Sequence, residues 1–301
     1  MLQDDLNFKS GFAVLAGLAN AGKSTLLNKF AGVDLSPVTH KPQTTRQNIL
    51  AICEGKDYQI VFVDTPGFLH AEYKLQEVML NSLNQAVSED ADLVIFVYDA
   101  TSTLSKHLEL VKKLKELYCP ILLVINKVDL VKDKDELLKI KNAICAQLPI
   151  KQVFYVNAKK GEGIDKVQSA VADYIPFSPP YFPKGQLTDR WERFYIAEFI
   201  REQIFLLYNQ EIPYSTFVEV ETFTEDLGDK NFIRAIIYTE RENQKAILIG
   251  KGGSAIGKLR KNAEERICQF LQKKYRLELR VEVSPAWRSN VKQLKKFGYI
   301  D

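Results

Sequence analysis

The chain contains little cysteine and histidine, and neither is spaced for metal binding. The four cysteines stand at positions 53, 119, 145 and 268 without a C-x-x-C pair, and the three histidines stand far apart at 40, 70 and 107. We therefore expect neither a zinc site nor a disulfide framework. This cysteine usage also favours a reducing, cytoplasmic compartment.

Long apolar runs are also missing. No run approaches the roughly 20 residues that cross a bilayer. Residues 1–10 lack the basic start and apolar centre of a secretory signal. We therefore expect no membrane span and no cleaved leader. The 301 residues leave room for two domains, each with its own core.

A phosphate-binding loop is present near the start of the chain. Gly-Leu-Ala-Asn-Ala-Gly-Lys-Ser, from Gly17 to Ser24, fits G-x-x-x-x-G-K-[ST] at every fixed position. An apolar run at 12–16 precedes it and a helical pattern at 24–30 follows, which is the context that the motif requires. Lys23 would bridge the β- and γ-phosphates of a nucleoside triphosphate, and the Ser24 hydroxyl would bind Mg²⁺. The residues predicted to surround the phosphates are Gly17, Asn20, Ala21, Gly22, Lys23, Ser24 and Thr25.

The base is decided by the sequence Asn-Lys-Val-Asp at 126–129, which follows the apolar run 121–125. At the carboxyl end of a parallel strand, the Asp129 carboxylate can accept hydrogen bonds from guanine N1–H and from the 2-amino group. Adenine lacks these donors and would leave the carboxylate unpaired. Asn126 would brace the site, and the Lys127 stem would lie over the base. The sequence therefore predicts GTP and GDP as ligands.

A metal ligand is predicted after another apolar run, 58–63. This run ends in Asp-Thr-Pro-Gly, so Asp64 would hold Mg²⁺ through water and the Gly67 N–H would meet the γ-phosphate. Phe68 stands where Ras-like enzymes place the glutamine that orients the attacking water. Hydrolysis therefore needs another source of positioning or charge. The catalytic candidates are Lys23, Thr45 and Gly67.

The polar, turn-rich stretch 36–46 lies between the phosphate loop and this run. One of its threonines could close over Mg²⁺ and the γ-phosphate. Thr45 is favoured and Thr44 is the second choice. An ordinary surface loop is the alternative interpretation.

Apolar runs alternate with helical patterns up to about residue 175. The runs are 12–16, 58–63, 93–98, 121–125 and 153–156, and the helical patterns include 104–117 and 136–148. The alternation predicts an α/β P-loop NTPase domain over residues 1–175, with a mostly parallel sheet covered by helices on both faces. Four prolines between 176 and 183 then predict a stiff linker over 176–188.

The order of elements changes after this linker. The predicted elements are a helix at 191–208 capped by Asp189, strands at 216–223 and 231–238 joined by an acidic turn at Gly228, helices at 244–249 and 254–273, and a strand at 276–283. Gly-Lys-Gly-Gly at 250–253 lies between the two later helices. The α-β-β-α-α-β order with this loop resembles a type II KH domain, whose G-x-x-G loop clamps single-stranded RNA. We therefore predict an α+β RNA-binding domain over 189–285, and a purely structural turn is the alternative.

Positive charge gathers in the last part of the chain. Residues 241–301 contain 15 Lys and Arg against six Asp and Glu, a net charge of +9, whereas the whole chain carries +3. Such a field suits an RNA backbone. The basic and aromatic tail 286–301 suits base stacking, with a frayed end as the alternative. The residues predicted to contact RNA are Lys245, Ile249, Gly250, Lys251, Gly252, Gly253, Lys258, Arg260, Lys261, Trp287 and Arg288.

Together these motifs resemble the Era family of bacterial ribosome-assembly GTPases. The similarity runs from the phosphate loop through Gln-Thr-Thr-Arg at 43–46 to the loop at 249–253, which is nearly the whole chain. It implies a third base-recognition element at Asn157, Ala158 and Lys159, where the family usually has Ser-Ala. It also implies K⁺ beside Asn20 and slow, K⁺-stimulated hydrolysis, with a backbone-capping role as the alternative for Asn20.

The resemblance also implies partners. It predicts binding near the 3′ end of small-subunit ribosomal RNA during 30S assembly. No feature of the sequence indicates an obligate dimer, so we expect a monomer, and we expect no binding to DNA. Cytoplasmic localisation with peripheral inner-membrane association is implied as well. Two alternatives stay open at this point, an RNA chaperone that holds GTP as a structural ligand with negligible turnover, and a GTPase of tRNA modification.

Overall fold

The structure is a computed structural model that describes residues 7–225 and 231–300. It divides into two compact units. Of the described residues, the first contains 7–36, 45–70 and 79–189. The second contains 37–44, 71–78, 190–225 and 231–300. Two segments of the predicted nucleotide-binding domain therefore belong to the second unit.

The first unit is built on a six-stranded sheet in the order β2-β3-β1-β4-β5-β6. The strands are β1 (Lys9–Ala16), β2 (Ile49–Glu54), β3 (Tyr58–Asp64), β4 (Leu93–Asp99), β5 (Ile121–Asn126) and β6 (Ile150–Val156). All neighbours are parallel except β2, which pairs antiparallel to β3. Every residue of β5 is buried, because helices cover both faces of a parallel sheet. The predicted mostly parallel sheet is confirmed, and the edge strand β2 is an addition to it.

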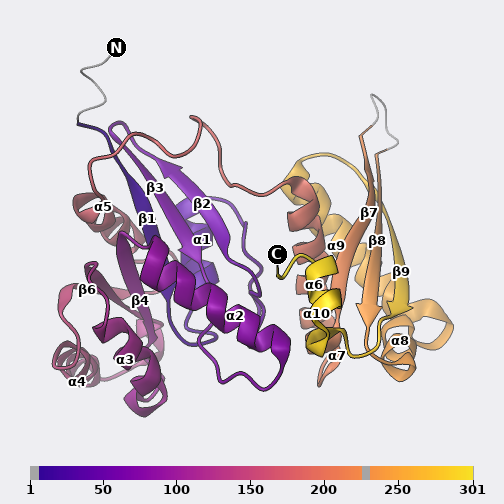
Figure 1. Cartoon of the computed structure of the whole chain (residues 1–301), viewed down its shortest axis with the longest axis horizontal. Helices are drawn as coiled ribbons and strands as arrows, with labels where there is room; N and C mark the ends of the chain where they lie inside the picture. Colours follow the sequence, from indigo (N-terminus) through magenta and orange to yellow (C-terminus); the bar gives the residue numbers. More distant parts are fainter. Residues whose placement is uncertain (1–6, 226–230, 301) are drawn as a thin grey trace. The chain divides into compact units, whose positions relative to one another are not determined.

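Helices lie on both faces of this sheet (Figure 1). They are α1 (Lys23–Ala31), α2 (Lys74–Gln85), α3 (Leu108–Lys115), α4 (Lys134–Cys145) and α5 (Ile164–Tyr174). Leu83, Leu114 and Ile144, from α2, α3 and α4, share one core cluster with Val14 of β1. Helices α1 and α5 contact each other and lie behind the sheet in Figure 1. Because β1, β3, β4 and β5 run parallel, their carboxyl ends bring the sequence motifs to one edge of the sheet.

The proline-rich segment 176–188 is part of the first unit rather than a separate connector, and its stiffness stays a prediction. The Pro176 carbonyl accepts a hydrogen bond from the Ser10 N–H (3.1 Å), and the Leu187 carbonyl accepts one from the Ile52 N–H (2.9 Å). Prolines stop a helix but keep their carbonyl groups as acceptors. The segment is therefore non-helical and is hydrogen-bonded to β1 and β2. The boundary between the units falls after Asp189.

The second unit has the predicted α-β-β-α-α-β order. Its elements are α6 (Glu192–Leu207), α7 (Ile212–Ser215), β7 (Phe217–Thr224), β8 (Phe232–Thr239), α8 (Glu242–Ile249), α9 (Ser254–Leu271) and β9 (Arg276–Val283). The sheet order is β7-β8-β9, with β7 antiparallel and β9 parallel to β8. The predicted cap is wrong, because Trp191 rather than Asp189 occupies the N-cap position of α6 and no side chain caps this helix. The predicted turn at Gly228 lies outside the described residues.

The tail predicted at 286–301 is folded onto the second unit. A 3-10 turn (Trp287–Ser289) leads into α10 (Val291–Lys296). Trp287 and Leu294 have no exposed surface, and the Phe297 ring stacks on Phe217 with 4.0 Å between ring centroids. The interpretations as a separate tail or a frayed end are both wrong, because its apolar side chains complete the core beside β7. Among the described residues no helix is long and apolar enough to cross a membrane.

Candidate functional site

The phosphate loop is held by close packing at its glycines. A Cβ atom on Gly22 would lie 2.1 Å from the Asn126 Nδ2, and the φ of this glycine is 100°. A Cβ on Gly17 would lie 2.5 Å from the Val97 carbonyl oxygen, and one on Gly67 would lie 2.6 Å from the Ala19 backbone. Glycine is therefore required at these positions by space, and at Gly22 also by backbone conformation.

Lys23 is the first residue of α1, and its side chain folds back along the loop. It is 5% exposed, and its Nζ donates to the carbonyl groups of Gly17 (3.1 Å) and Leu18 (2.9 Å). Burial lowers the pKa of Lys23 to about 8, and the Asp64 carboxylate partly opposes this shift. A buried ammonium aimed along the loop carbonyls suits an anionic ligand.

Three predicted Mg²⁺ ligands come together at the end of β3. The Asp64 Oδ2 accepts from the Ser24 hydroxyl (2.7 Å) and the Thr45 hydroxyl (3.2 Å), and these two hydroxyls lie 3.0 Å apart. The Asp64 Oδ1 is buried without a hydrogen-bond partner in the described residues. Burial raises the pKa of Asp64, while Lys23 and the three hydroxyl donors lower it. An oxygen-only set with an unpaired carboxylate oxygen fits Mg²⁺, which prefers oxygen ligands and retains water.

The third of these hydroxyl donors, Ser36, was missed by the sequence analysis. Its Oγ donates to the Asp64 Oδ2 at 2.7 Å, and Asn28 of α1 fixes its backbone through hydrogen bonds of 2.7 and 2.8 Å. The position of Ser36 at the start of the turn-rich stretch 36–46 was the available signal. A serine there looks the same in sequence whether it points inward or into solvent.

The structure separates Thr44 from Thr45. The Thr45 hydroxyl belongs to the Asp64 cluster, whereas the Thr44 hydroxyl bonds to Thr39 (2.6 Å) and to the Lys41 carbonyl (2.8 Å). The two residues also belong to different compact units. Of the two threonines, Thr45 is therefore the one placed to reach a metal beside Ser24.

The base-recognition residues are arranged around Asn126. Its Nδ2 donates to the Ala21 carbonyl (2.9 Å), and its Oδ1 accepts from the Ala158 N–H (3.0 Å). The Lys127 Nζ lies 2.6 Å from the Asp99 carboxylate. Asp129 is exposed on a 3-10 turn (Val128–Leu130), so its carboxylate is open to a ligand. Asn126 thus joins the phosphate loop, β5 and the segment after β6 into one frame.

The remaining predicted nucleotide contacts flank this frame. Asn157 is 2% exposed, and its Oδ1 accepts from the Lys160 N–H at 3.2 Å. Lys159 is exposed, and Thr25 is half-buried within α1. Asn20 is exposed in a left-handed conformation with φ of 63°. Asn157 therefore supports the loop that follows β6.

Phe68 is buried, and its phenyl ring has no group that could hydrogen-bond to water. It is 8% exposed within the core cluster, and its N–H donates to the Gly17 carbonyl at 3.0 Å. The Lys113 Nζ lies 5.4 Å from the centroid of its ring. Its packing matches the expectation that the residue after Gly67 does not orient water.

The predicted RNA loop connects α8 to α9. Gly250, Gly252 and Gly253 all have positive φ, at 72°, 60° and 77°, and a Cβ on Gly250 would lie 2.6 Å from the Ala255 Cβ. The Lys251 side chain is exposed at the tip. Because Gly252 has no Cβ, its backbone is open to a phosphate.

Basic residues surround this loop. Lys258 and Lys261 are exposed on α9, and Arg260 is exposed but pairs with Glu264 at 3.1 Å. Lys245 and Ile249 are half-buried on α8. These side chains lie on the two helices that the loop joins, as the charge distribution of the sequence predicts.

Trp287 is not available to RNA, so its prediction as a stacking residue is wrong. The ring has no exposed surface, and its Nε1 donates to the Ser215 carbonyl at 2.8 Å. Arg288 is mostly buried, and its Nε donates to Glu240 at 3.0 Å. An aromatic residue among basic ones has the same pattern whether it stacks on a base or fills a core.

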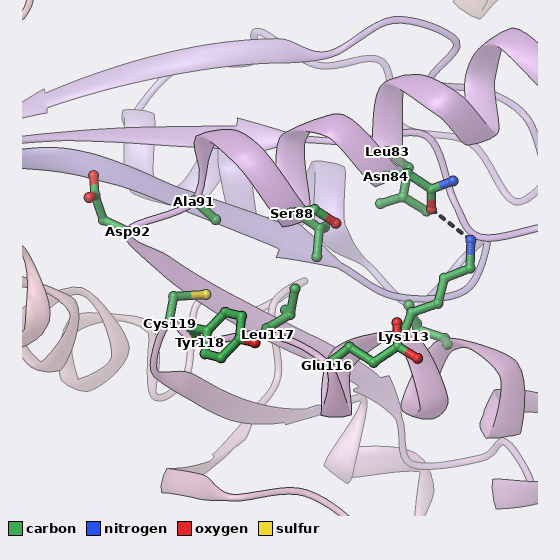
Figure 2. A pocket seen from close by; sticks show the side chains of 12 residues that line it. Leu83, Asn84, Ser88, Ala91, Asp92, Lys113, Glu116, Leu117, Tyr118 and Cys119 are labelled. Carbon is green, nitrogen blue, oxygen red and sulfur yellow. Dashed lines mark hydrogen bonds between the residues drawn. The ribbon is translucent and has the colours of Figure 1, made fainter.

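A cavity of about 710 Å³ lies between α2 and α3 (Figure 2). Its wall includes Leu83, Leu117 and Tyr118, and the Lys113 Nζ reaches the Asn84 Oδ1 at 2.8 Å across it. It borders the residues that precede β4 and β5, whereas the nucleotide motifs follow the carboxyl ends of the strands. The cavity is therefore separate from the predicted site.

Comparison with protein families agrees with both halves of this description. A family described as 50S ribosome-binding GTPase matches residues 12–127, and a KH domain family matches residues 211–288. The chain is thus a P-loop GTPase joined to a KH RNA-binding domain.

Similarity to individual proteins narrows this class. GTPase Era of Elusimicrobium minutum is 59% identical over 98% of this chain and 99% of its own length. The chloroplast GTPase ERA1 of Zea mays is 39% identical over 97% of this chain and 71% of its own length. The chain belongs to the Era family of GTPases, which confirms the predicted family, fold class and activity and decides against the two alternatives left open by the sequence.

Two solved structures resemble the whole chain. Aquifex aeolicus Era bound to GDP·AlF4⁻, a single-residue variant, is 31% identical, with a TM-score of 0.93 over 98% of this chain and 100% of that one. Era in complex with MgGDPNP and nucleotides 1506–1542 of 16S ribosomal RNA gives the same identity, TM-score and coverage. These structures show an Era protein with a guanine nucleotide, Mg²⁺ and rRNA.

Proposed function

We propose that this GTPase binds small-subunit ribosomal RNA near its 3′ end and acts as a nucleotide-dependent switch in 30S assembly. The observation that carries the proposal is that one chain holds both a complete guanine and Mg²⁺ residue set and an exposed Gly-Lys-Gly-Gly loop flanked by basic helices. The solved Era complex with 16S rRNA nucleotides 1506–1542 supports the RNA assignment.

In this proposal GTP binds along the phosphate loop with Mg²⁺ beside it. Ser24 and Thr45 would ligate Mg²⁺ and Asp64 would hold it through water, and the bound ion would supply positive charge beside the β- and γ-phosphates. Lys23 holds the same phosphates from the α1 side, and the Gly67 N–H donates to the γ-phosphate. Asp129 reads the base.

Hydrolysis is proposed to use K⁺ held at Asn20, because the buried Phe68 cannot orient water. A cation beside the β–γ bridge stabilises charge on the leaving phosphate as an arginine finger does. Single-turnover hydrolysis should be several-fold faster in KCl than in NaCl for the parent and equal in both salts for Asn20→Asp. Asn81 is exposed on α2, so Asn81→Asp is the matched control and should behave like the parent. Equal rates in both salts for the parent would remove the K⁺ proposal.

RNA binding is proposed to centre on Gly252. Its φ is 60°, and a Cβ added there would meet nothing within 4 Å, which leaves room for an RNA phosphate. An aspartate at this position would repel that phosphate. Fluorescence anisotropy with an oligonucleotide from the 3′ end of 16S rRNA should show about tenfold or greater loss of affinity for Gly252→Asp.

The matched control is Gly185→Asp in the first unit, where φ is also left-handed and nothing lies within 4 Å of the added Cβ. It should bind RNA like the parent, and both variants should bind GTP like the parent. RNA affinity that is unchanged in Gly252→Asp would contradict the proposal that RNA binds at this loop.

We further propose a cytoplasmic protein with peripheral contact to the inner membrane through α10. The exposed Lys292, Lys295 and Lys296 on this short helix support contact with anionic headgroups. Co-sedimentation of RNA-free protein with phosphatidylglycerol vesicles should be salt-sensitive and should weaken when these lysines are replaced by glutamine. No sedimentation at low salt would contradict this proposal.

A further inference from the structure

We propose that Asp99 is a positioning residue for guanine recognition, because it anchors the Lys127 ammonium and so fixes the Lys127 stem beside the base. This inference rests on the proposed guanine site and deepens it. Asp99 lies outside all five sequence motifs of the nucleotide site (17–24, 43–46, 64–67, 126–129 and 157–159), so the motifs alone do not point to it.

Asp99 occupies a place in the sheet that suits this role. It is the last residue of β4 and pairs in register with Asn126, the last residue of β5. The Ala100 N–H donates to the Asn126 carbonyl at 2.9 Å, so the ends of the two strands are tied together. One Asp99 oxygen, Oδ2, lies 2.6 Å from the Lys127 Nζ. The carboxylate therefore comes from the strand next to the base-recognition motif.

The other oxygen of Asp99 prevents the carboxylate from rotating. Its Oδ1 accepts from the Thr101 N–H (2.9 Å) and from the Thr101 hydroxyl (2.7 Å). The turn that carries these groups is held from the core side, since the Tyr98 hydroxyl donates to the Ser102 carbonyl (2.8 Å) and a His107 ring nitrogen lies 3.1 Å from the Ser102 hydroxyl. Both oxygens are thus committed, and the anchor for Lys127 is rigid.

The pair is partly shielded from solvent, which makes it stronger than a surface ion pair. The exposed fractions are 31% for the Lys127 side chain and 17% for Asp99. Burial raises the pKa of Asp99, but hydrogen bonds from Lys127 and Thr101 outweigh burial and hold the pKa below its usual value. Asp99 therefore stays ionised at neutral pH and keeps its hold on the ammonium.

Lys127 benefits from such an anchor because of its backbone and its length. Its φ is 61°, a left-handed conformation that aims the side chain in a direction set by the motif itself. A free lysine side chain loses most of its rotamer freedom when it is fixed against a ligand, and that loss corresponds to roughly tenfold in affinity. An ammonium already held by Asp99 has lost this freedom before GDP or GTP arrives.

The test compares Asp99→Asn, Asp99→Glu, Lys127→Met and the double variant Asp99→Asn with Lys127→Met. Asparagine keeps the acceptor for Thr101 but loses the charge, and methionine keeps an apolar stem but loses the ammonium. The measurements are dissociation rates of a fluorescent GDP, affinities for GDP and inosine diphosphate, and the thermal midpoint of nucleotide-free protein. Glu109→Gln removes an exposed carboxylate from the first unit and is the matched control.

We expect Asp99→Asn and Lys127→Met each to release GDP about tenfold faster, and the double variant to be no faster than either. Asp99→Glu should recover part of the loss. The ratio of GDP to inosine diphosphate affinity should not change, because the 2-amino group is read by Asp129. Glu109→Gln should match the parent, and thermal midpoints should agree within a few degrees.

Two results separate the inference from the proposed function. If the parent binds GDP and inosine diphosphate equally well, the proposed guanine site is wrong. If Lys127→Met releases GDP at the parent rate, only the role of Asp99 is overturned, because Asp99 acts through the Lys127 ammonium. If Lys127→Met is fast but Asp99→Asn matches the parent, or if the two effects multiply in the double variant, only the role of Asp99 is overturned. A loss of thermal midpoint in Asp99→Asn that Asp99→Glu does not recover would also overturn it, since that pattern belongs to a purely structural residue.

Discussion

At the scale of single residues, the nucleotide site is built around two buried charges. Lys23 and Asp64 are both buried. Burial lowers the pKa of Lys23 and raises the pKa of Asp64, which favours the neutral form of each side chain. The charge of each residue opposes the shift of the other. Phosphates beside Lys23 and Mg²⁺ beside Asp64 would favour the charged form of each. The ligand-free fold bears the cost of burying these two groups, and ligand binding would offset part of it.

GTP binding should take up a proton above pH 8. Because burial lowers the pKa of Lys23 to about 8, this lysine is largely neutral at pH 8.8 before binding. Phosphates raise its pKa, so the complex binds more protons, and the affinity should fall by up to about tenfold for each pH unit above 8. Calorimetry in two buffers of different ionisation enthalpy should give close to one proton per GTP at pH 8.8. At pH 7.0 it should give none from Lys23. Proton release at pH 8.8 would contradict the assignment.

At the scale of elements, the C-terminal segment shows how one pattern serves two purposes. Helix α10 places Leu294 inside and Lys292, Lys295 and Lys296 outside. Trp287 and Phe297 pack against β7 from either end of this helix. Basic and aromatic residues alternate here because the segment is amphipathic, and its charge remains available at the surface.

Trp287→Ala should strongly destabilise the second unit. Loss of a fully buried indole costs about 3–5 kcal/mol in the free energy of unfolding, and the Ser215 carbonyl would lose its donor. Trp191→Ala is the matched control, since that side chain is 82% exposed and its loss should cost less than about 0.5 kcal/mol. Urea unfolding followed by circular dichroism measures both. Equal midpoints for the two variants would show that Trp287 is not a core residue.

At the scale of the whole molecule, the division of the chain suggests how nucleotide and RNA binding are linked. Residues 37–44 belong to the second unit, where the Lys41 Nζ donates to the Phe205 carbonyl (2.6 Å) and the Val38 N–H donates to Glu202 (2.8 Å). Thr45, the next residue of the chain, belongs to the Asp64 cluster of the first unit. The segment 37–44 is therefore hydrogen-bonded to α6 and joined through the chain to Thr45 of the Asp64 cluster. GTP that orders residues 36–47 and 65–73 would act on this segment first.

RNA affinity should therefore depend on the bound nucleotide. We expect the dissociation constant for the 16S rRNA oligonucleotide to differ about fivefold or more between the GTP-analogue and GDP complexes, with the same factor in the reverse measurement. Lys41→Met should reduce this factor and leave GDP affinity unchanged. Lys29→Met, an exposed lysine of α1, is the control. Identical RNA affinities in both nucleotide states would contradict a switch.

The sequence by itself determined the two domain types and the place of the nucleotide motifs. The phosphate loop, the Asp64 turn and the 126–129 motif depend on residue types at fixed local spacing, and each follows a strand whose apolar run is visible in sequence. The α-β-β-α-α-β order was equally readable, because its helices and strands carry their own periodic patterns. Local chemistry was sufficient for these features.

Tertiary structure alone decided which distant side chains meet. Ser36 reaches Asp64 across 28 positions, Lys127 reaches Asp99 across the same separation, and Trp287 reaches Ser215 across 72. It also added β2 and placed the proline-rich segment on the first unit. A hydroxyl, a carboxylate or an indole has the same local signature whether it faces solvent or a partner. Its partner is set only when the sheet order and the packing of helices bring the two together.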